Sequence, residues 1–187
     1  MQYFKLIDDL DNPPGRWFLG ELNFDDEWDF WKYISVGRVD VPKKDLFVSL
    51  RKDGFPIDFT FADFELMILN EKAANLMSKD DVQFIPVAVN GCTSGNPYYL
   101  TTIINEIDCV DEEKSVFDRW ELDNDIRPDK AGQYKTFYKL FVNQDKCEGS
   151  QIFRLKNYNS VIIVNESLKR EFERNNLSGV KFQKVSS

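Results

Sequence analysis

Two segments of the chain repeat the same order of apolar and polar residues. Each begins with four consecutive apolar residues, continues with Asn-Glu and a helix-forming stretch, and ends in a second short apolar run; the segments are residues 66–84 and 161–182. Short apolar runs of this kind fit buried strands. The side chains of Asn70 and Asn165 can accept hydrogen bonds from free N–H groups at a helix start, and the Glu that follows meets the positive end of the helix dipole. The pattern therefore predicts two similar strand–helix–strand units.

Further extended segments are expected outside these units. The sequence Asn-Pro-Pro-Gly at residues 12–15 ends an apolar opening segment, and Pro86, which cannot donate to a strand ladder, places its own strand at a sheet edge. Strands are expected within residues 4–10, 55–61, 84–89, 98–107 and 150–155. Strands followed by short helices, with long polar connections, predict an α+β fold: a mixed, mostly antiparallel sheet with a few short helices. The chain of 187 residues fits one domain, covering residues 1–187.

Acidic residues gather in one part of the chain. Residues 106–129 hold ten acids and three bases, which accounts for most of the net charge of −8, whereas residues 134–187 hold ten bases and five acids. A solvated surface is the ordinary reading of such a run, but a concentrated negative surface also speeds encounter with a basic partner and rejects acidic ones. We expect this stretch to contact a partner.

A second candidate segment lies near the start of the chain, where acids alternate with tryptophan and phenylalanine. Large aromatic side chains often anchor protein interfaces, although they can equally fill a core. Together the two segments give a set of candidate partner-binding residues: Asp25, Asp26, Glu27, Trp28, Asp29, Trp31, Asp108, Asp111, Glu112, Glu113, Asp118, Glu121, Asp123 and Asp125.

The absence of histidine from the sequence narrows the chemistry. Catalytic Ser-His-Asp and Cys-His arrangements and the HExxH zinc site cannot be built without it. The three cysteines, Cys92, Cys109 and Cys147, form no CxxC pair, are odd in number and fit reduced thiols. We therefore expect no catalytic residues, no metal site and no cofactor. The acids around Asp108 and Asp111 leave one alternative open, a carboxylate pair for hydrolysis or for a hard cation, although their spacing matches no EF-hand loop.

Other features bear on location and on partners. The first residues lack the basic region of a signal peptide, and no stretch approaches the ~20 apolar residues that span a bilayer. These features predict a cytoplasmic protein that does not bind membranes. Because the chain is acidic overall, direct binding to nucleic acid is not expected either.

The C-terminal part also resembles a known family. Residues 152–155, 161–169 and 177–182, together with Tyr98-Tyr99-Leu100, Asn105 and Asp108, are similar to the signature of a bacterial immunity-protein family that was first catalogued as a domain of unknown function and then assigned to polymorphic-toxin systems. The resemblance runs from about residue 55 onward, and residues 1–54 match only in general character. It implies a non-catalytic cytoplasmic protein that binds and neutralises a cognate toxin, often one delivered between bacteria by a contact-dependent secretion system.

A nuclease is the toxin that the acidic stretch suits best, since carboxylates can occupy a basic groove that binds phosphates. Two alternatives from other classes stay open: a small hydrolase that depends on carboxylates, and a non-catalytic adaptor subunit of a larger assembly. A homo-oligomer is compatible with each of them.

Overall fold

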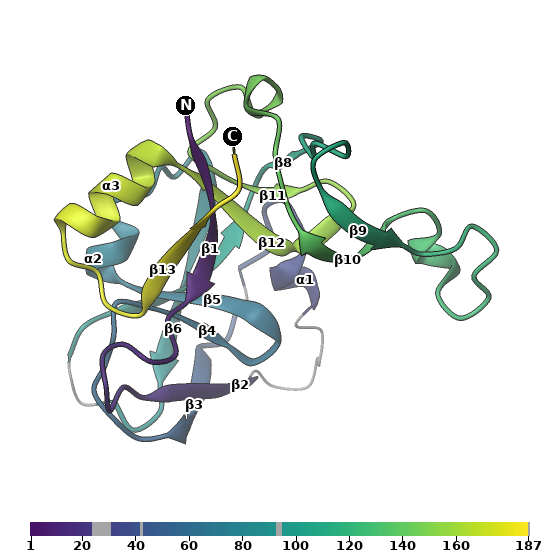
Figure 1. Ribbon diagram of the computed structural model, residues 1–187. Helices are drawn as coiled ribbons and strands as arrows, with labels where there is room; N and C mark the ends of the chain where they lie inside the picture. Colours follow the sequence, from purple (N-terminus) through teal and green to yellow (C-terminus); the bar gives the residue numbers. More distant parts are fainter. Residues whose placement is uncertain (24–30, 42, 93–94, 187) are drawn as a thin grey trace.

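Strands dominate the computed structural model, which describes residues 1–23, 31–41, 43–92 and 95–186 (Figure 1). These residues form thirteen strands in three sheets but only three short α-helices, α1 (Trp31–Ile34), α2 (Glu71–Ala74) and α3 (Glu166–Arg174). The expected α+β class is therefore wrong, and the fold is mostly β. Several of the strands show no clean alternation in sequence, because strand formation depends on packing across the sheet as well as on local pattern.

Six strands form a sheet that curls almost into a barrel. In order across the sheet they are β2 (Phe18–Asn23), β3 (Leu46–Lys52), β6 (Val82–Val89), β7 (Tyr98–Ile103), β5 (Leu66–Asn70) and β4 (Phe59–Ala62). Neighbouring strands are antiparallel except β3 and β6. The edge strands β2 and β4 contact each other, and the curled sheet encloses a core that includes Trp17, Val48, Ile68 and Leu100.

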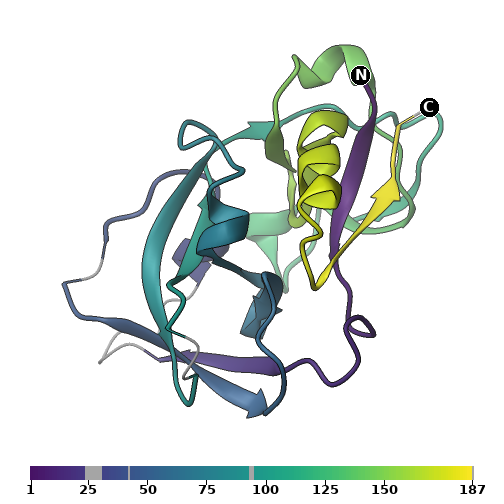
Figure 2. The same ribbon diagram turned by 90° about the vertical axis from the view of Figure 1, so that its left-hand side faces the viewer.

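Five strands form a second sheet beside the first. Their order is β13 (Val180–Lys184), β1 (Tyr3–Asp8), β12 (Tyr158–Asn165), β11 (Ile152–Leu155) and β8 (Glu106–Ile107), and only β11 and β8 are parallel. Figure 2 shows α3 and this sheet standing together beside the six-stranded sheet. The layers meet in a second core, to which Phe59, Ile162 and Phe172 belong.

The unbroken apolar runs of the sequence are strands that are buried on both faces. In β5, Leu66 and Ile68 point into the barrel core while Met67 and Leu69 point into the second core. The strand β12 does the same, because its residues 162 and 164 enter the second core and residues 161 and 163 enter a third core on the far side of the sheet. A strand with two buried faces needs no polar alternation, which explains the pattern.

The Asn caps of the two repeated units are confirmed. The side chain of Asn70 accepts from the backbone N–H of Ala73 at 3.0 Å, and that of Asn165 accepts from Leu168 at 2.9 Å. In neither unit do the two strands pair with each other. The strand β7 lies between β5 and β6, and β1 lies between β12 and β13.

One carboxylate joins the two units. Asp58 accepts from the side chain of Asn70 at 2.7 Å, and from the backbone and hydroxyl of Ser178 at 2.7 and 2.8 Å. Lys72 lies 3.6 Å from the same carboxylate. Burial opposes ionisation of Asp58, but these hydrogen bonds and the lysine outweigh it and hold its pKa below the ordinary value.

Pro86 does not mark an edge strand, contrary to expectation. Its strand, β6, lies inside the sheet, and Pro86 is paired with Tyr99 of β7. On its other side, however, the pairing with β3 begins only at Val87. Pro86 lies before the point where the pairing with β3 begins, so the N–H that it lacks does not cost the sheet a hydrogen bond to β3.

A buried guanidinium links the two large sheets. Arg16, whose side chain is 2% exposed, forms an ion pair with Asp8 at the end of β1 and donates to Thr60 of β4 at 2.6 Å. The Thr60 hydroxyl in turn donates to the Asp8 carboxylate at 2.8 Å, and the backbone N–H of Phe61 donates to it at 3.0 Å. The carboxylate of one sheet is thus satisfied by donors of the other.

A second buried arginine, Arg154 of β11, bonds to the start of the neighbouring strand, β12. Its guanidinium donates to the backbone carbonyl of Asn159, and burial lowers the pKa of Arg154 to about 10, against the opposing effect of the Glu65 carboxylate. The arginine of the family-like segment 152–155 is therefore a structural residue of the sheet.

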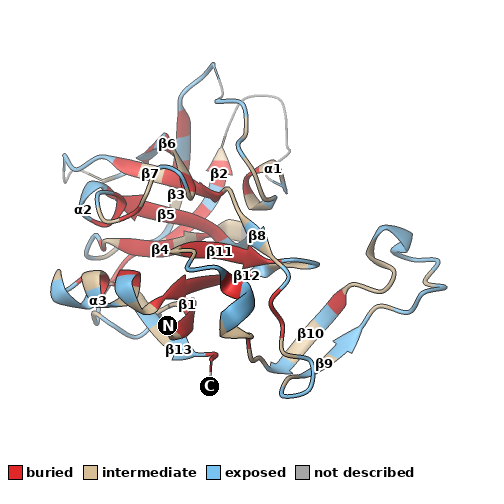
Figure 3. Cartoon of the chain, turned by 90° about the horizontal axis from the view of Figure 1, so that it is seen from above, coloured by how far each residue is buried: buried red, intermediate tan, exposed pale blue. Residues whose placement is uncertain are grey.

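The third sheet is a two-stranded arm. Its strands, β9 (Val116–Arg119) and β10 (Tyr134–Lys139), pair antiparallel, and the loop between them reaches away from the body of the molecule (Figures 1 and 3). We call residues 111–141 the arm and residues 120–133 its tip. The chain enters and leaves the arm through an isolated bridge between Val110 and Val142, both buried in the third core.

Replacing Arg16 should destabilise the protein strongly. Arg16→Ala leaves the Asp8 carboxylate in a site where it is only 11% exposed without its counter-charge, and removal of one partner of a buried pair typically costs about 3–5 kcal/mol. Urea unfolding followed by circular dichroism measures the change. The control is Arg51→Ala, which removes an ion pair with Asp63 whose arginine is 67% exposed and should change the free energy of unfolding by less than about 1 kcal/mol. Equal effects of the two substitutions would contradict the assigned role of Arg16.

Acid should remove the contribution of Asp58 to stability. Because the pKa of Asp58 is lower in the folded state, its ionised form stabilises the fold; this stability is complete above the unfolded pKa of about 4 and is lost as the pH falls through the folded pKa. The difference in free energy of unfolding between wild type and Asp58→Asn should shrink from pH 7 to pH 3. Substitution of the exposed Asp40 by Asn is the control. A difference for Asp58→Asn that stays constant across this range would disprove the linkage.

Candidate functional site

The acidic stretch of the sequence becomes the arm and its base. Part of its charge is neutralised within the arm: Asp111 pairs with Lys114 at 3.1 Å, and Glu112 pairs with Arg119 at 2.6 Å. Asp118 is exposed and accepts from the hydroxyl of Tyr138 at 2.7 Å. These three candidate residues hold the arm together.

The other acids of the stretch are differently placed. Asp108 and Glu113 lie exposed near the base of the arm, while Glu121, Asp123 and Asp125 lie exposed at its tip. Within the described part of the chain, the side chains of these five residues form no hydrogen bond or ion pair. Their charge is therefore available to a partner.

Two exposed apolar residues of the tip were not among the candidates predicted from the sequence. Leu122 is 84% exposed and Ile126 is 87% exposed, and both stand at the tip among the unpaired acids. An apolar side chain within a dense acidic segment, repeated four residues later, is the signal that could have identified them. Figure 3 shows the tip as an exposed loop far from the buried body of the molecule.

Internal hydrogen bonds give the tip a defined shape. The side chain of Asn124 accepts from the backbone N–H of Ile126 at 3.0 Å and of Arg127 at 3.3 Å. The side chain of Arg127 donates two hydrogen bonds to the carboxylate of Asp129, at 2.9 and 3.0 Å. The two sides of the tip are closed by Arg119, which donates to the Gly132 carbonyl at 2.7 Å. Such fixed loops lose little conformational freedom on binding.

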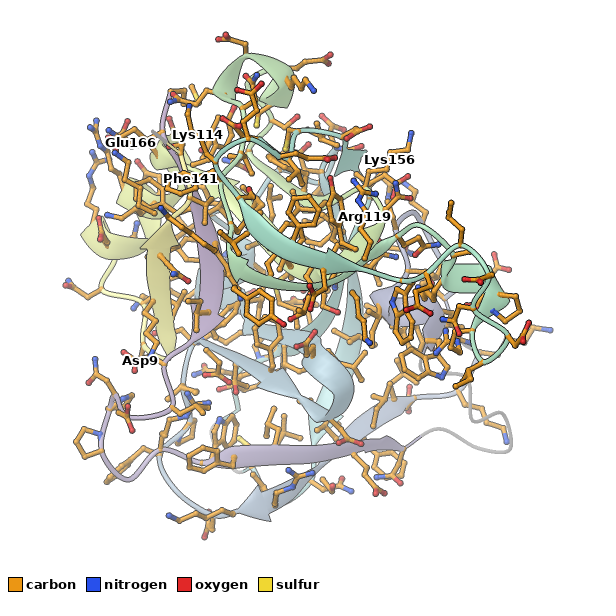
Figure 4. All side chains as sticks on the ribbon, turned by 45° about the vertical axis from the view of Figure 1, so that its right-hand side comes forward. Asp9, Lys114, Arg119, Phe141, Lys156 and Glu166 are labelled. Atoms are coloured by element: carbon orange, nitrogen blue, oxygen red, sulfur yellow. The ribbon has the colours of Figure 1, made fainter. Side chains whose placement is uncertain are left out.

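An aromatic cluster fastens the arm to the body. The rings of Phe117 and Tyr134 meet edge to face with centroids 5.0 Å apart. The ring of Phe137 lies tilted at 4.8 Å from Tyr134 and edge to face at 5.0 Å from Tyr158 of β12. Figure 4 places Lys114 and Phe141 at the end of the arm near the body and Arg119 toward the tip. Arg119 lies over the ring of Tyr134 at 4.3 Å. Burial raises the pKa of the Tyr134 hydroxyl, and its hydrogen bond to Glu112 adds to the rise.

The aromatic–acidic candidate segment is only partly visible. Asp25, Asp26, Glu27, Trp28 and Asp29 lie outside the described residues. Trp31, at the start of α1, is 61% exposed, so this ring does not fill the core. The structure does not bring Trp31 into the aromatic cluster of the arm.

The described residues also show how the other candidate groups, carboxylates and thiols, are placed. No group of three or more Cys, Asp or Glu side chains is placed there to hold a metal ion. The carboxylates of Asp111 and Glu112 are each engaged by a different base, and Cys109 and Cys147 are fully buried in the third core. No helix among the described residues has both the length and the apolar character that crossing a membrane requires.

Comparison with known proteins shows the family of this chain. A family model described as "Immunity protein family (Imm11)" matches residues 3–187, so the similarity includes the N-terminal third that the resemblance in the sequence had left aside. A search of curated proteins finds no match.

Loss of an aromatic anchor should loosen the arm selectively. Phe137→Ala removes the ring that joins Phe117 and Tyr134 to the body, so hydrogen–deuterium exchange should accelerate at the amides of β9 and β10 while those of β5 and β7 stay protected. The matched control is the next residue, Tyr138, which is 70% exposed; Tyr138→Ala removes only an exposed hydrogen bond to Asp118 and should accelerate exchange in the arm far less than Phe137→Ala does. Uniform acceleration over all strands by Phe137→Ala would show that the cluster serves the whole fold instead of the arm.

Proposed function

We propose that this chain, which belongs to the Imm11 immunity protein family, protects the cell that makes it by binding and neutralising a cognate protein toxin in the cytoplasm. The match over residues 3–187 carries the proposal, because it covers nearly the whole of the chain and the family is one of immunity proteins. Neutralisation by binding needs a surface that is accessible and already shaped for its partner.

The arm supports this role. It stands out from the body, its tip is fixed by its own hydrogen bonds, and the charges of Glu121, Asp123 and Asp125 are unpaired within the described residues. Unpaired surface charges of one sign speed association with an oppositely charged protein and affect its dissociation less. Asp108 and Glu113, near the base of the arm, are further exposed carboxylates.

A nuclease is the toxin class that this surface suits. The substrate groove of a nuclease is basic because it binds phosphates, and a row of carboxylates on a projecting arm can lie where the phosphates would lie. Binding by the arm would then neutralise the toxin by keeping nucleic acid out of its groove. The described residues give no specific support for a carboxylate-dependent hydrolase or for an adaptor subunit.

A rescue experiment tests the function. A toxin domain encoded in the neighbouring reading frame is expressed from an inducible promoter in a sensitive bacterium, with or without this chain. Growth should be restored by the chain, and the two purified proteins should elute as one complex from a sizing column. Failure both to rescue and to bind would remove the proposed function.

Salt tests the electrostatic part. The association rate with the toxin domain should fall steeply between 50 and 300 mM NaCl, since unpaired surface charges are screened over about 10 Å at 0.1 M. Surface plasmon resonance at several salt concentrations gives this dependence. An association rate that is indifferent to salt would argue against mimicry of nucleic acid while leaving neutralisation itself intact.

A further inference from the structure

The tip of the arm carries two large apolar side chains among exposed carboxylates. Leu122 and Ile126 are almost fully exposed, and they stand among carboxylates that are not paired within the described residues. We infer that Leu122 and Ile126 enter an apolar pocket of the toxin whose rim is basic, with Glu121, Asp123 and Asp125 facing that rim. This inference rests on the proposed function and names the contact through which it acts.

The exposure of the two side chains has no explanation within the fold. Single exposed apolar residues are common on protein surfaces, but two large ones on one short loop, at 84% and 87% exposure, leave most of their apolar area in water. Residues that gain most from burial on binding are those that anchor interfaces, particularly where surrounding polar groups keep water away from them. The acids of the tip provide such a polar rim.

The loop also holds the two side chains ready. Asn124 lies between them in sequence and accepts from the backbone of Ile126 and Arg127, which sets the turn that carries Ile126. Gly132, at φ +73°, faces Leu122 so closely that a Cβ there would lie 3.1 Å from the Leu122 Cδ2 atom. One edge of Leu122 therefore approaches the opposite side of the loop. A partner meets a loop backbone that is already shaped and has less of the chain to order on binding.

The shape of the arm selects the kind of surface that it can reach. The tip lies at the end of a two-stranded projection, well beyond the body of the molecule in two views (Figures 1 and 3). A projection of this kind can enter a recess that the body could not. The negative rim disfavours nucleic acid and anionic lipid as occupants, so the partner is a protein with a hollow, cationic surface.

A second copy of this chain is the competing occupant. It offers a hollow of about 370 Å³ between α3 and β13, lined by Phe172, Leu177 and Phe182 with Lys169 and Lys181 beside them. Docking of the tip there would be a contact between unlike surfaces, which makes rings or open chains of molecules. Measurement of the mass of the isolated protein in solution distinguishes this from binding to the toxin.

The experiment compares three variants with the wild type in binding to the purified toxin domain. Leu122→Ala with Ile126→Ala should raise Kd by about 100-fold or more, almost entirely through faster dissociation, because anchor residues typically contribute ~30-fold or more each. Glu121→Gln with Asp123→Asn and Asp125→Asn should instead slow association by about 10-fold and flatten its salt dependence. Val116→Ala, at an exposed apolar side chain of the same arm outside its tip, is the matched control and should change Kd by less than about 3-fold.

The possible outcomes test the inference about the tip and the proposed function separately. If wild type binds and neutralises the toxin while the Leu122 and Ile126 double variant, shown to be folded by hydrogen exchange in β9 and β10, binds within 3-fold of it, the inference is overturned and the proposed function stands. If wild type does not bind at all, the proposed function falls first. If the double variant turns an oligomer into a monomer and keeps its affinity for the toxin, the tip is a self-association surface and the inference is again overturned.

Discussion

The buried guanidinium of Arg16 determines how the two large sheets sit against each other. It lies after β1 in the chain, yet it bonds at the same time to Asp8 of β1 and to Thr60 of β4, and the Asp8 carboxylate accepts from the backbone of β4 as well. A charge in such a place is tolerated only where its partners are fixed, because each lost hydrogen bond leaves a buried ion unsatisfied. The cluster therefore adds directional bonds to the apolar packing between the sheets.

The position of the arm depends on that arrangement. One face of the five-stranded sheet packs on the barrel, and the other carries the third core, in which Val110 and Val142 close the base of the arm and Tyr158 supports its aromatic cluster. Since β1 and β12 are neighbours in this sheet, the residues that fix the sheet also fix the platform beneath the arm. A two-stranded ribbon is only marginally stable by itself. The arm therefore depends on the sheet and the third core beneath it to stay ordered.

Local sequence predicted both caps and many of the strands, though not β2, β3, β9 or β10, and it did not show how the strands are joined. Asn70 and Asn165 could be identified as caps because capping is a contact across three residues. The insertion of β7 and of β1 between the strands of each unit could not be read, because it depends on partners far along the chain. The fold class was wrong for the same reason. Pro86 shows the limit most clearly, since whether a proline faces an empty edge depends on where the neighbouring strand begins.

The sequence predicted the acidic residues of the candidate site but not its exposed apolar residues. Within residues 106–129 of the described chain, each of the three bases pairs with an acid: Lys114 with Asp111, Arg119 with Glu112 and Arg127 with Asp129. The local excess of negative charge therefore survives folding. It lies on the acids that pair with no base within the described residues, and several of these acids are at the tip. Charge that the fold does not use, beside apolar area that the fold does not bury, is the basis on which we propose the tip as the surface that contacts a partner. The sequence shows the excess of charge, and only the structure shows the exposed apolar area.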